Sequence, residues 1–119
     1  MLVADIHHVS LNVSDAGRAL GFYRDVLGLT ELQRPTFPFG GAWLDAGAGR
    51  QIHLIEADVP ADLGQHVAFR VDSVDEVIAH LRAAGVSVGD ARNVGDTGIL
   101  QAFAVDPDGN RVEFTQPVA

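Results

Sequence analysis

The chain has 119 residues, no cysteine, 16 acidic against 8 basic residues, and a formal net charge of −8. With 47% hydrophobic and 20% charged residues, it is long enough and apolar enough for one folded domain with a core. The acidic balance and the absence of lysine argue against nucleic acid as a partner, and no apolar run is long enough to span a membrane. Without cysteine or a basic leader, the chain is expected to be cytoplasmic.

The first half is expected to form a strand, a helix and then three strands. Residues 6–13 alternate between apolar and polar, which is typical of a half-buried strand. Ser14 or Asp15 can cap a helix over about 16–27, and Gly28 can end it. The three predicted strands cover residues 30–34, 42–45 and 51–56, with a loop rich in proline and glycine at 35–41.

The second half repeats this order. A strand over 66–71 leads into a capping box, in which Ser73 is the cap and Glu76 follows three residues later. The helix is expected to reach about residue 84 and to stop at Gly85. Beyond it, the pattern predicts strands at 86–88, 99–105 and 111–115, a loop at 93–98 and a tight turn at 106–110.

The two halves are also similar in sequence. Residues 8–13 read HVSLNV and residues 66–71 read HVAFRV. Such internal similarity predicts a duplicated unit, here with modules at about 1–57 and 65–119. We therefore expect an α+β fold in which two tandem βαβββ modules form a curved mixed-sheet cleft within a single domain, residues 1–119.

Aligning the modules pairs His8 with His66 and His53 with Glu113. A strand-helix crossover buries one face of each sheet, so the two opening histidines are expected on the opposite face. Pairing the modules about a pseudo-twofold axis would bring all four side chains to one centre. Imidazole and carboxylate donors suit Zn²⁺, Ni²⁺, Co²⁺, Mn²⁺ or Fe²⁺, and four protein ligands on a six-coordinate ion leave two positions open.

Each of these residues also has an ordinary interpretation. A single histidine on a strand is more often a surface or hydrogen-bonded residue than a metal ligand, and an isolated Glu113 would be a solvent-facing charge. Only their symmetric placement favours the metal site. Two other histidines are excluded from it: His7 is expected to face the helix side, and His80 is expected to be exposed on the second helix.

Four segments of the chain are distinctive: HVSLNV at 8–13, FYRDVLGL at 22–29, HVAF at 66–69 and DPDGNRVEF at 106–114. Through these segments, nearly the whole chain resembles a known family, the vicinal oxygen chelate superfamily. The superfamily includes glyoxalase I, methylmalonyl-CoA epimerase, extradiol dioxygenases, fosfomycin-resistance thiol transferases and bleomycin-binding proteins. The resemblance implies paired βαβββ modules and a divalent metal held by His8, His53, His66 and Glu113.

The resemblance further implies a metal-dependent lyase or isomerase of the glyoxalase I type. Such an enzyme acts on a substrate with vicinal oxygens through a metal-stabilised enediolate. Glu113 is the only carboxylate in the set and is assigned the proton transfer, although a purely structural ligand role is equally compatible. His53 departs from the carboxylate or glutamine that glyoxalase I has at this position.

The same comparison suggests residues that contact the substrate. Arg70 shares a strand face with His66 and can hold a substrate carboxylate, with a rim salt bridge as the plainer alternative. Asn12 is its counterpart in the first half, where glyoxalase I often has an arginine that helps to hold glutathione. The expected lining of the pocket is aromatic, with a core role as the alternative for each residue: Phe37, Phe39, Trp43 and Phe103.

Other activities remain open at this level. Extradiol dioxygenases and fosfomycin-resistance enzymes use three ligands rather than four, and a non-enzymatic drug-binding protein of the bleomycin type needs no metal. The expected partner is a small-molecule substrate. The resemblance also implies a homodimer, and the sequence leaves open whether one chain completes the site alone or shares it with a second chain.

Overall fold

The computed structural model describes residues 1–118 and divides into two compact units of similar size. Unit 1 spans residues 1–61, and unit 2 begins at Asp62. In this described part of the chain, no helix combines the length and the apolar composition that crossing a bilayer requires.

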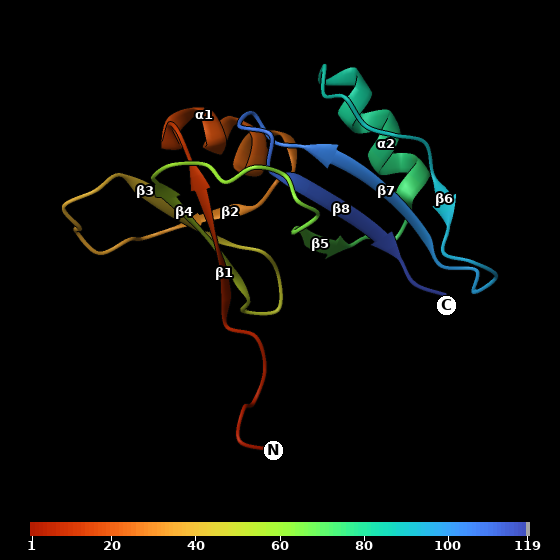
Figure 1. Cartoon of the computed structure of the whole chain (residues 1–119), viewed down its shortest axis with the longest axis horizontal. Helices are drawn as coiled ribbons and strands as arrows, with labels where there is room; N and C mark the ends of the chain where they lie inside the picture. The colour runs from red at the N-terminus through yellow and green to blue at the C-terminus, as the bar shows by residue number, and fades with distance from the viewer. Residues whose placement is uncertain (119) are drawn as a thin grey trace. The chain divides into compact units, whose positions relative to one another are not determined.

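Unit 1 is a four-stranded mixed sheet with one helical segment against it (Figure 1). The strand order is β1-β4-β3-β2, in which β1 is parallel to β4 and the other pairs are antiparallel. Its elements are β1 (His8–Val13), α1 (Ala16–Leu20), the π-helix η1 (Gly21–Val26), β2 (Thr30–Leu32), β3 (Gly41–Asp45) and β4 (Gln51–Glu56).

The helical segment of unit 1 begins and ends as predicted but changes type in the middle. Asp15 is the N-cap and accepts a hydrogen bond from the backbone N–H of Arg18, and Gly28 follows the helix with a positive φ of 84°. The expectation of one continuous α-helix is wrong, because residues 21–26 form a π-helix. In that wider turn, the adjacent Phe22 and Tyr23 are both buried in the core.

Unit 2 repeats the architecture. The strand order is β5-β8-β7-β6, with β5 parallel to β8, and α2 packs against β7 and β8. Its elements are β5 (Val67–Arg70), α2 (Val74–Ala83), β6 (Arg92–Asn93), β7 (Leu100–Val105) and β8 (Arg111–Gln116). Ser73 caps α2 by accepting a hydrogen bond from the N–H of Glu76, as predicted. The α+β fold with two βαβββ modules is thus confirmed.

One edge of the second sheet differs from the prediction. The strand expected at 86–88 is reduced to an isolated bridge between Val88 and Ala104, and pairing resumes only at β6, where Arg92 lies opposite Gln101. The glycine and polar residues between these points interrupt the ladder, so the strand lies later than predicted, at Arg92–Asn93, where its last residue falls in the segment expected to be a loop.

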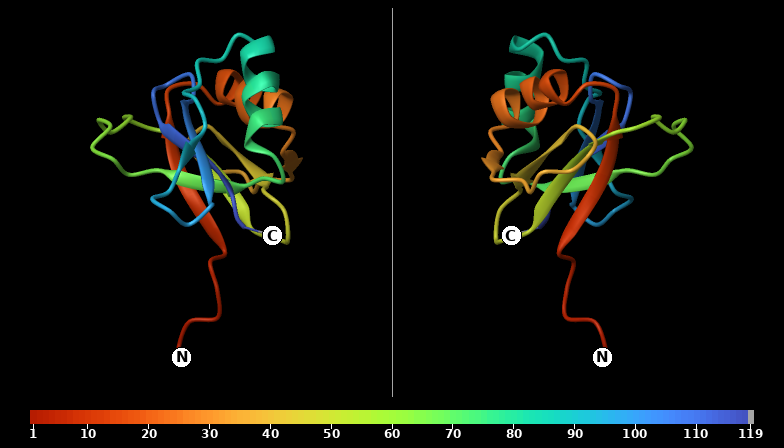
Figure 2. Two further views of the ribbon diagram at one scale, coloured as in Figure 1. Left: turned by 90° about the vertical axis from the view of Figure 1, so that its right-hand side faces the viewer. Right: turned by 90° about the vertical axis from the view of Figure 1, so that its left-hand side faces the viewer.

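The first residues of unit 1 extend away from its sheet, as both views in Figure 2 show. Met1 and Leu2 are fully exposed. His7, which was expected to face the helix side, is instead exposed, and its Nδ1 lies 2.9 Å from Nδ1 of His8. The reason is that β1 begins only at His8, so His7 is not yet part of the alternating strand. His80 is exposed as predicted.

Gly41 at the start of β3 is expected to tolerate no side chain. A Cβ there would collide with the backbone carbonyl oxygen of Leu54 on the neighbouring strand. We expect Gly41→Ala to lower the free energy of unfolding by about 1–3 kcal/mol, measured by urea denaturation. Gly21→Ala is the matched control, since a Cβ there meets nothing within 4 Å and φ is −56°. It should be neutral or stabilise by up to about 1 kcal/mol.

Candidate functional site

In unit 2, a histidine and a glutamate meet on the sheet face opposite α2. His66 immediately precedes β5, and Glu113 lies in the middle of β8, whose neighbours Val112 and Phe114 point into the core. The His66 Nε2 atom is 2.9 Å from Oε1 of Glu113, and His66 Nδ1 is 2.7 Å from the carbonyl oxygen of Gly64. Two of the four predicted metal ligands therefore lie in contact within one unit.

These contacts determine which nitrogen of the His66 ring carries a hydrogen and which nitrogen can bind a metal ion. Gly64 offers only an acceptor, so Nδ1 carries a hydrogen and donates it. Nε2 then faces the Glu113 carboxylate, and these two atoms can both serve as ligands of one metal ion. Metal-binding histidines commonly donate their other N–H to a backbone carbonyl in this way. Two ligands about 2.1 Å from one ion at a right angle lie about 3 Å apart, so the observed 2.9 Å fits.

In unit 1, His8 and His53 form part of an aromatic stack. Their ring centroids are 4.0 Å apart, and the indole of Trp43 stacks on the other side of His53 at 4.1 Å. His53 lies opposite Ser10 on β1 and Trp43 on β3, so β4 presents its ring on the sheet face between the rings of His8 and Trp43. Its Nε2 is 2.8 Å from Oε1 of Gln51, an interaction that the sequence did not suggest.

The environment of His53 favours its neutral form. The residue is buried, with 7% of its surface exposed, and burial lowers the pKa of its imidazole. His8 and His7 lower the pKa further, because each would place a like charge nearby. A neutral imidazole keeps the lone pair that metal binding requires.

The four predicted metal ligands lie in two pairs, one pair in each unit. Among the described residues, no group of three His, Cys, Asp or Glu side chains in unit 1 or in unit 2 lies in a geometry that could hold a metal ion. In unit 1 the rings of His8 and His53 stack, and in unit 2 the donor atoms of His66 and Glu113 are 2.9 Å apart. Nitrogen and carboxylate donors of this kind suit divalent transition metals.

The residues predicted to contact a substrate differ in their exposure and in their contacts. Asn12 donates its Nδ2–H to the carbonyl oxygen of Asp58, 2.8 Å away. Arg70 follows His66 by four residues along an alternating strand and is exposed, with no hydrogen bond or ion pair in residues 1–118. Phe103 meets the His66 ring edge-on at 5.5 Å.

The remaining aromatic predictions cluster in unit 1. Phe37 and Phe39 stack at 5.1 Å and are both exposed, and the Arg34 guanidinium lies over the two rings. Trp43 connects this cluster to His53, because its ring is 6.2 Å from that of Phe37. The aromatic side chains thus form a continuous row within the unit.

An ion pair between Arg111 and Asp62 in unit 2 was not predicted from the sequence. Arg111 donates through Nε and Nη2 to Oδ2 of Asp62, at 3.2 and 3.1 Å. Arg111 precedes Glu113 by two residues on β8, so strand alternation places the two on one face. The two-residue spacing of Arg111 and Glu113 could be read from the sequence. No sequence pattern, however, connects Arg111 with Asp62, which lies 49 residues earlier.

Asp62 gives a pH-dependent prediction. The N–H of Gly64 and then the Arg111 guanidinium hold the pKa of this carboxyl below its usual value of about 3.9. A lowered folded-state pKa stabilises the fold above the unfolded pKa, and this stabilisation is lost as the pH falls through the folded pKa. Asp62→Asn should therefore weaken the dependence of stability on pH below about pH 4, measured by urea unfolding across that range. Asp96→Asn, at an exposed position of the same unit, is the control.

Comparison with known proteins agrees with this architecture. The sequence model of the Glyoxalase/Bleomycin resistance protein/Dioxygenase superfamily matches residues 5–114. Lactoylglutathione lyase of Haemophilus influenzae is 30% identical, covering 93% of this chain and 91% of its own. Metallothiol transferase FosB of Lysinibacillus sphaericus is 28% identical, covering 96% and 83%. The crystal structure of a glyoxalase family protein from Enterococcus faecalis superposes with a TM-score of 0.83 at 31% identity, over 97% and 99% of the two chains. The chain therefore belongs to the Glyoxalase/Bleomycin resistance protein/Dioxygenase superfamily.

Proposed function

We propose that this protein is a divalent-metal-dependent lyase or isomerase of the glyoxalase I type that acts on a small substrate with vicinal oxygens. The observation that carries the proposal is the His66–Glu113 pair, with donor atoms 2.9 Å apart and the far nitrogen of His66 held by the Gly64 carbonyl. The proposed ligands of the metal ion are His8, His53, His66 and Glu113. A bound metal would supply Lewis-acid stabilisation of negative charge on the substrate oxygens. Similarity to a lactoylglutathione lyase supports this choice.

Glu113 is the proposed proton carrier. Its carboxylate has one oxygen near His66, and its side chain is only 15% exposed. Limited exposure reduces competition from water, so a proton removed from one substrate carbon can be returned to the adjacent carbon. Phe103, which lies opposite Glu113 on β7 and against the His66 ring, shields the pair further.

A second candidate uses three ligands, as in the fosfomycin-resistance thiol transferases and extradiol dioxygenases. The specific observation in its favour is the position of His53, which is buried between His8 and Trp43 and hydrogen-bonded to Gln51. A ring held in this way can serve as a packed support for His8 rather than as a ligand. Similarity to a metallothiol transferase is consistent with this candidate.

Metal binding distinguishes these candidates. The full chain, stripped of metal and titrated with Ni²⁺, Zn²⁺ and Mn²⁺ by calorimetry, should bind one ion. His66→Gln should weaken binding at least about tenfold in either case, which corresponds to about 1.4 kcal/mol. His53→Gln should weaken it comparably if four ligands are used and leave it nearly unchanged if three are used. His80→Gln, at an exposed position on α2, is the control.

Turnover then tests the reaction itself. Hemithioacetals, 2-methylacyl-CoA esters, catechols and fosfomycin represent the reaction classes under consideration. Isomerisation of a hemithioacetal would support the glyoxalase I proposal, whereas thiol addition to fosfomycin or oxygen-dependent ring cleavage would replace it with the three-ligand candidate. A chain that binds none of the three metals and turns over none of the substrates would instead be a binding protein.

A further inference from the structure

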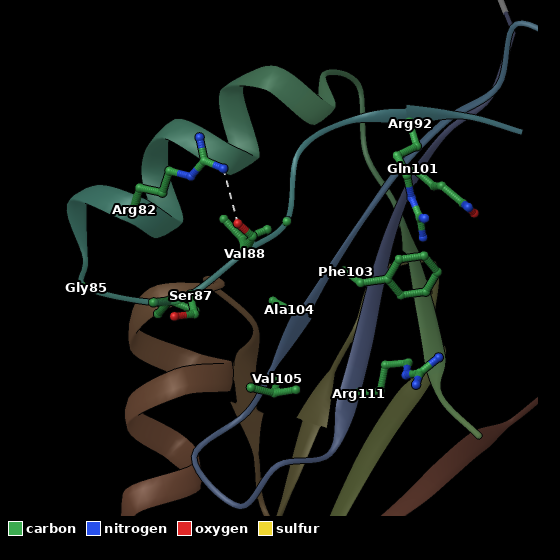
Figure 3. A pocket seen from close by; sticks show the side chains of 12 residues that line it. Arg82, Gly85, Ser87, Val88, Arg92, Gln101, Phe103, Ala104, Val105 and Arg111 are labelled. Atoms are coloured by element: carbon green, nitrogen blue, oxygen red, sulfur yellow. Dashed lines mark hydrogen bonds between the residues drawn. The ribbon is translucent and has the colours of Figure 1, made fainter. Parts of the chain in front are cut away.

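Unit 2 contains a hollow whose lining is cationic, although the chain as a whole is acidic. Its volume is about 910 Å³, and it opens along the edge of β7, beside the segment that follows α2 (Figure 3). Three arginines and no acidic residue belong to the lining. The lining residues are Arg82, Gly85, Val86, Ser87, Val88, Gly89, Arg92, Gln101, Phe103, Ala104, Val105 and Arg111. The positive charge of this lining contrasts with the net charge of −8 on the chain.

Two of the arginines are arranged around one aromatic ring. The guanidinium carbons of Arg92 and Arg111 lie 5.8 and 5.9 Å from the centroid of the Phe103 ring. Figure 3 shows the two guanidinium groups on two sides of that ring. The electron-rich face of an aromatic ring attracts a cation, so Phe103 helps to hold both guanidinium groups.

The arginine pair lies next to the His66–Glu113 pair described above. Phe103 lies directly opposite Glu113 in the β7–β8 register, and its ring is 5.5 Å from that of His66. Arg111 shares the face of β8 on which Glu113 lies. A small molecule that reaches His66 and Glu113 would therefore extend past Phe103 towards the two guanidinium groups.

The three arginines are neutralised to different degrees. Arg82 donates to Oδ1 of Asp90 and to the carbonyl of Val88, and Arg111 donates to a single oxygen of Asp62. Arg92 has no carboxylate partner among residues 1–118. A positive charge without a partner, next to a second cation, attracts an anion into the hollow.

We propose that Arg92 and Arg111 bind the oxyanion group, a carboxylate or a phosphate, of the substrate. This assignment rests on the proposed function for the identity of the reacting end, and it adds that the substrate is an anion. Guanidinium groups suit the oxygens of carboxylates and phosphates because their N–H groups form a planar fork. Phe103 keeps the two cations apart and provides an apolar surface for the carbon chain between the anionic end and the reacting end.

The test uses the full chain after metal removal and requires no turnover. Inorganic phosphate and acetate are titrated separately, and backbone amide signals are followed by NMR. We expect the signals of Gln101 and Phe103 to shift on addition of either phosphate or acetate, and the probe that binds more tightly identifies the oxyanion. Arg92→Ala should weaken that binding at least about tenfold, and Arg92→Lys should restore part of it.

Two further variants make the result specific. Arg111→Lys keeps the positive charge but removes the planar fork, so it should weaken binding several-fold without disturbing the fold. Arg50→Ala removes an exposed arginine of unit 1 that pairs with Asp5, and it should leave the affinity unchanged. Equal affinities of wild type and Arg92→Ala for both probes would refute the assignment. Because the protein is free of metal, failure of the metal-binding test would not alter this result, and failure here would not alter metal binding.

Discussion

Glu113→Gln should lower kcat/KM by about 10²–10⁴-fold for whichever substrate the turnover screen identifies. The amide keeps the size of the side chain but cannot accept and return a proton, and it is a poor metal ligand. Because Glu113 is paired with His66 at 2.9 Å, the loss should appear in kcat as well as in metal affinity. Initial rates at saturating metal separate the two effects.

Glu76→Gln is the matched control for this experiment. Glu76 is an exposed glutamate of the same unit, in the first turn of α2. Its replacement should leave the rate within about twofold, corresponding to less than 0.5 kcal/mol. A Glu113→Gln protein that retained full activity with bound metal would show that Glu113 is only a structural ligand, and the proton carrier would have to be sought elsewhere.

Leu81→Ala should lower the free energy of unfolding by about 2–5 kcal/mol. Leu81 is fully buried on α2, and truncating its side chain leaves a cavity that the surrounding sheet and helix can fill only in part. A loss of this size is a large fraction of the stability of a small domain. Urea denaturation followed by circular dichroism measures the change.

Leu63 offers a control with the same side chain. It belongs to the same unit but is 88% exposed, so Leu63→Ala should change the stability by no more than about 0.5 kcal/mol. If the two variants unfolded at the same urea concentration, the packing of α2 on β7 and β8 would contribute far less than its burial indicates.

The fold was predictable because its signals are local. Alternating residues identify β1, β4 and β8, Asp15 and Ser73 cap the two helices, and the repeated HV segments show that one unit occurs twice. The π-helix was not predictable, because an i to i+5 hydrogen bond such as that from Leu27 N–H to the Phe22 carbonyl leaves no distinct residue pattern.

The candidate site was predictable only in part. Alternation placed His66 and Glu113 on one face of the second sheet, and the structure brings them into contact. Side-chain stacking depends on rotamers, so the position of His53 between His8 and Trp43 could not be predicted from the residue pattern. The arginine pair was missed because Arg92 occupies a two-residue strand at an edge, which is too short to show a period.

The parallel pairing of β5 with β8 also bears on synthesis of the protein. His66 and Glu113 are 47 residues apart, so the two donors meet only when the final strand of their unit has joined the first. Closing a loop of this length comes late, after the local turns and the helix can form. A nascent chain that still lacks its last strand therefore has no assembled donor pair, and the two proposed ligands of unit 2 come together only after β8 has been translated.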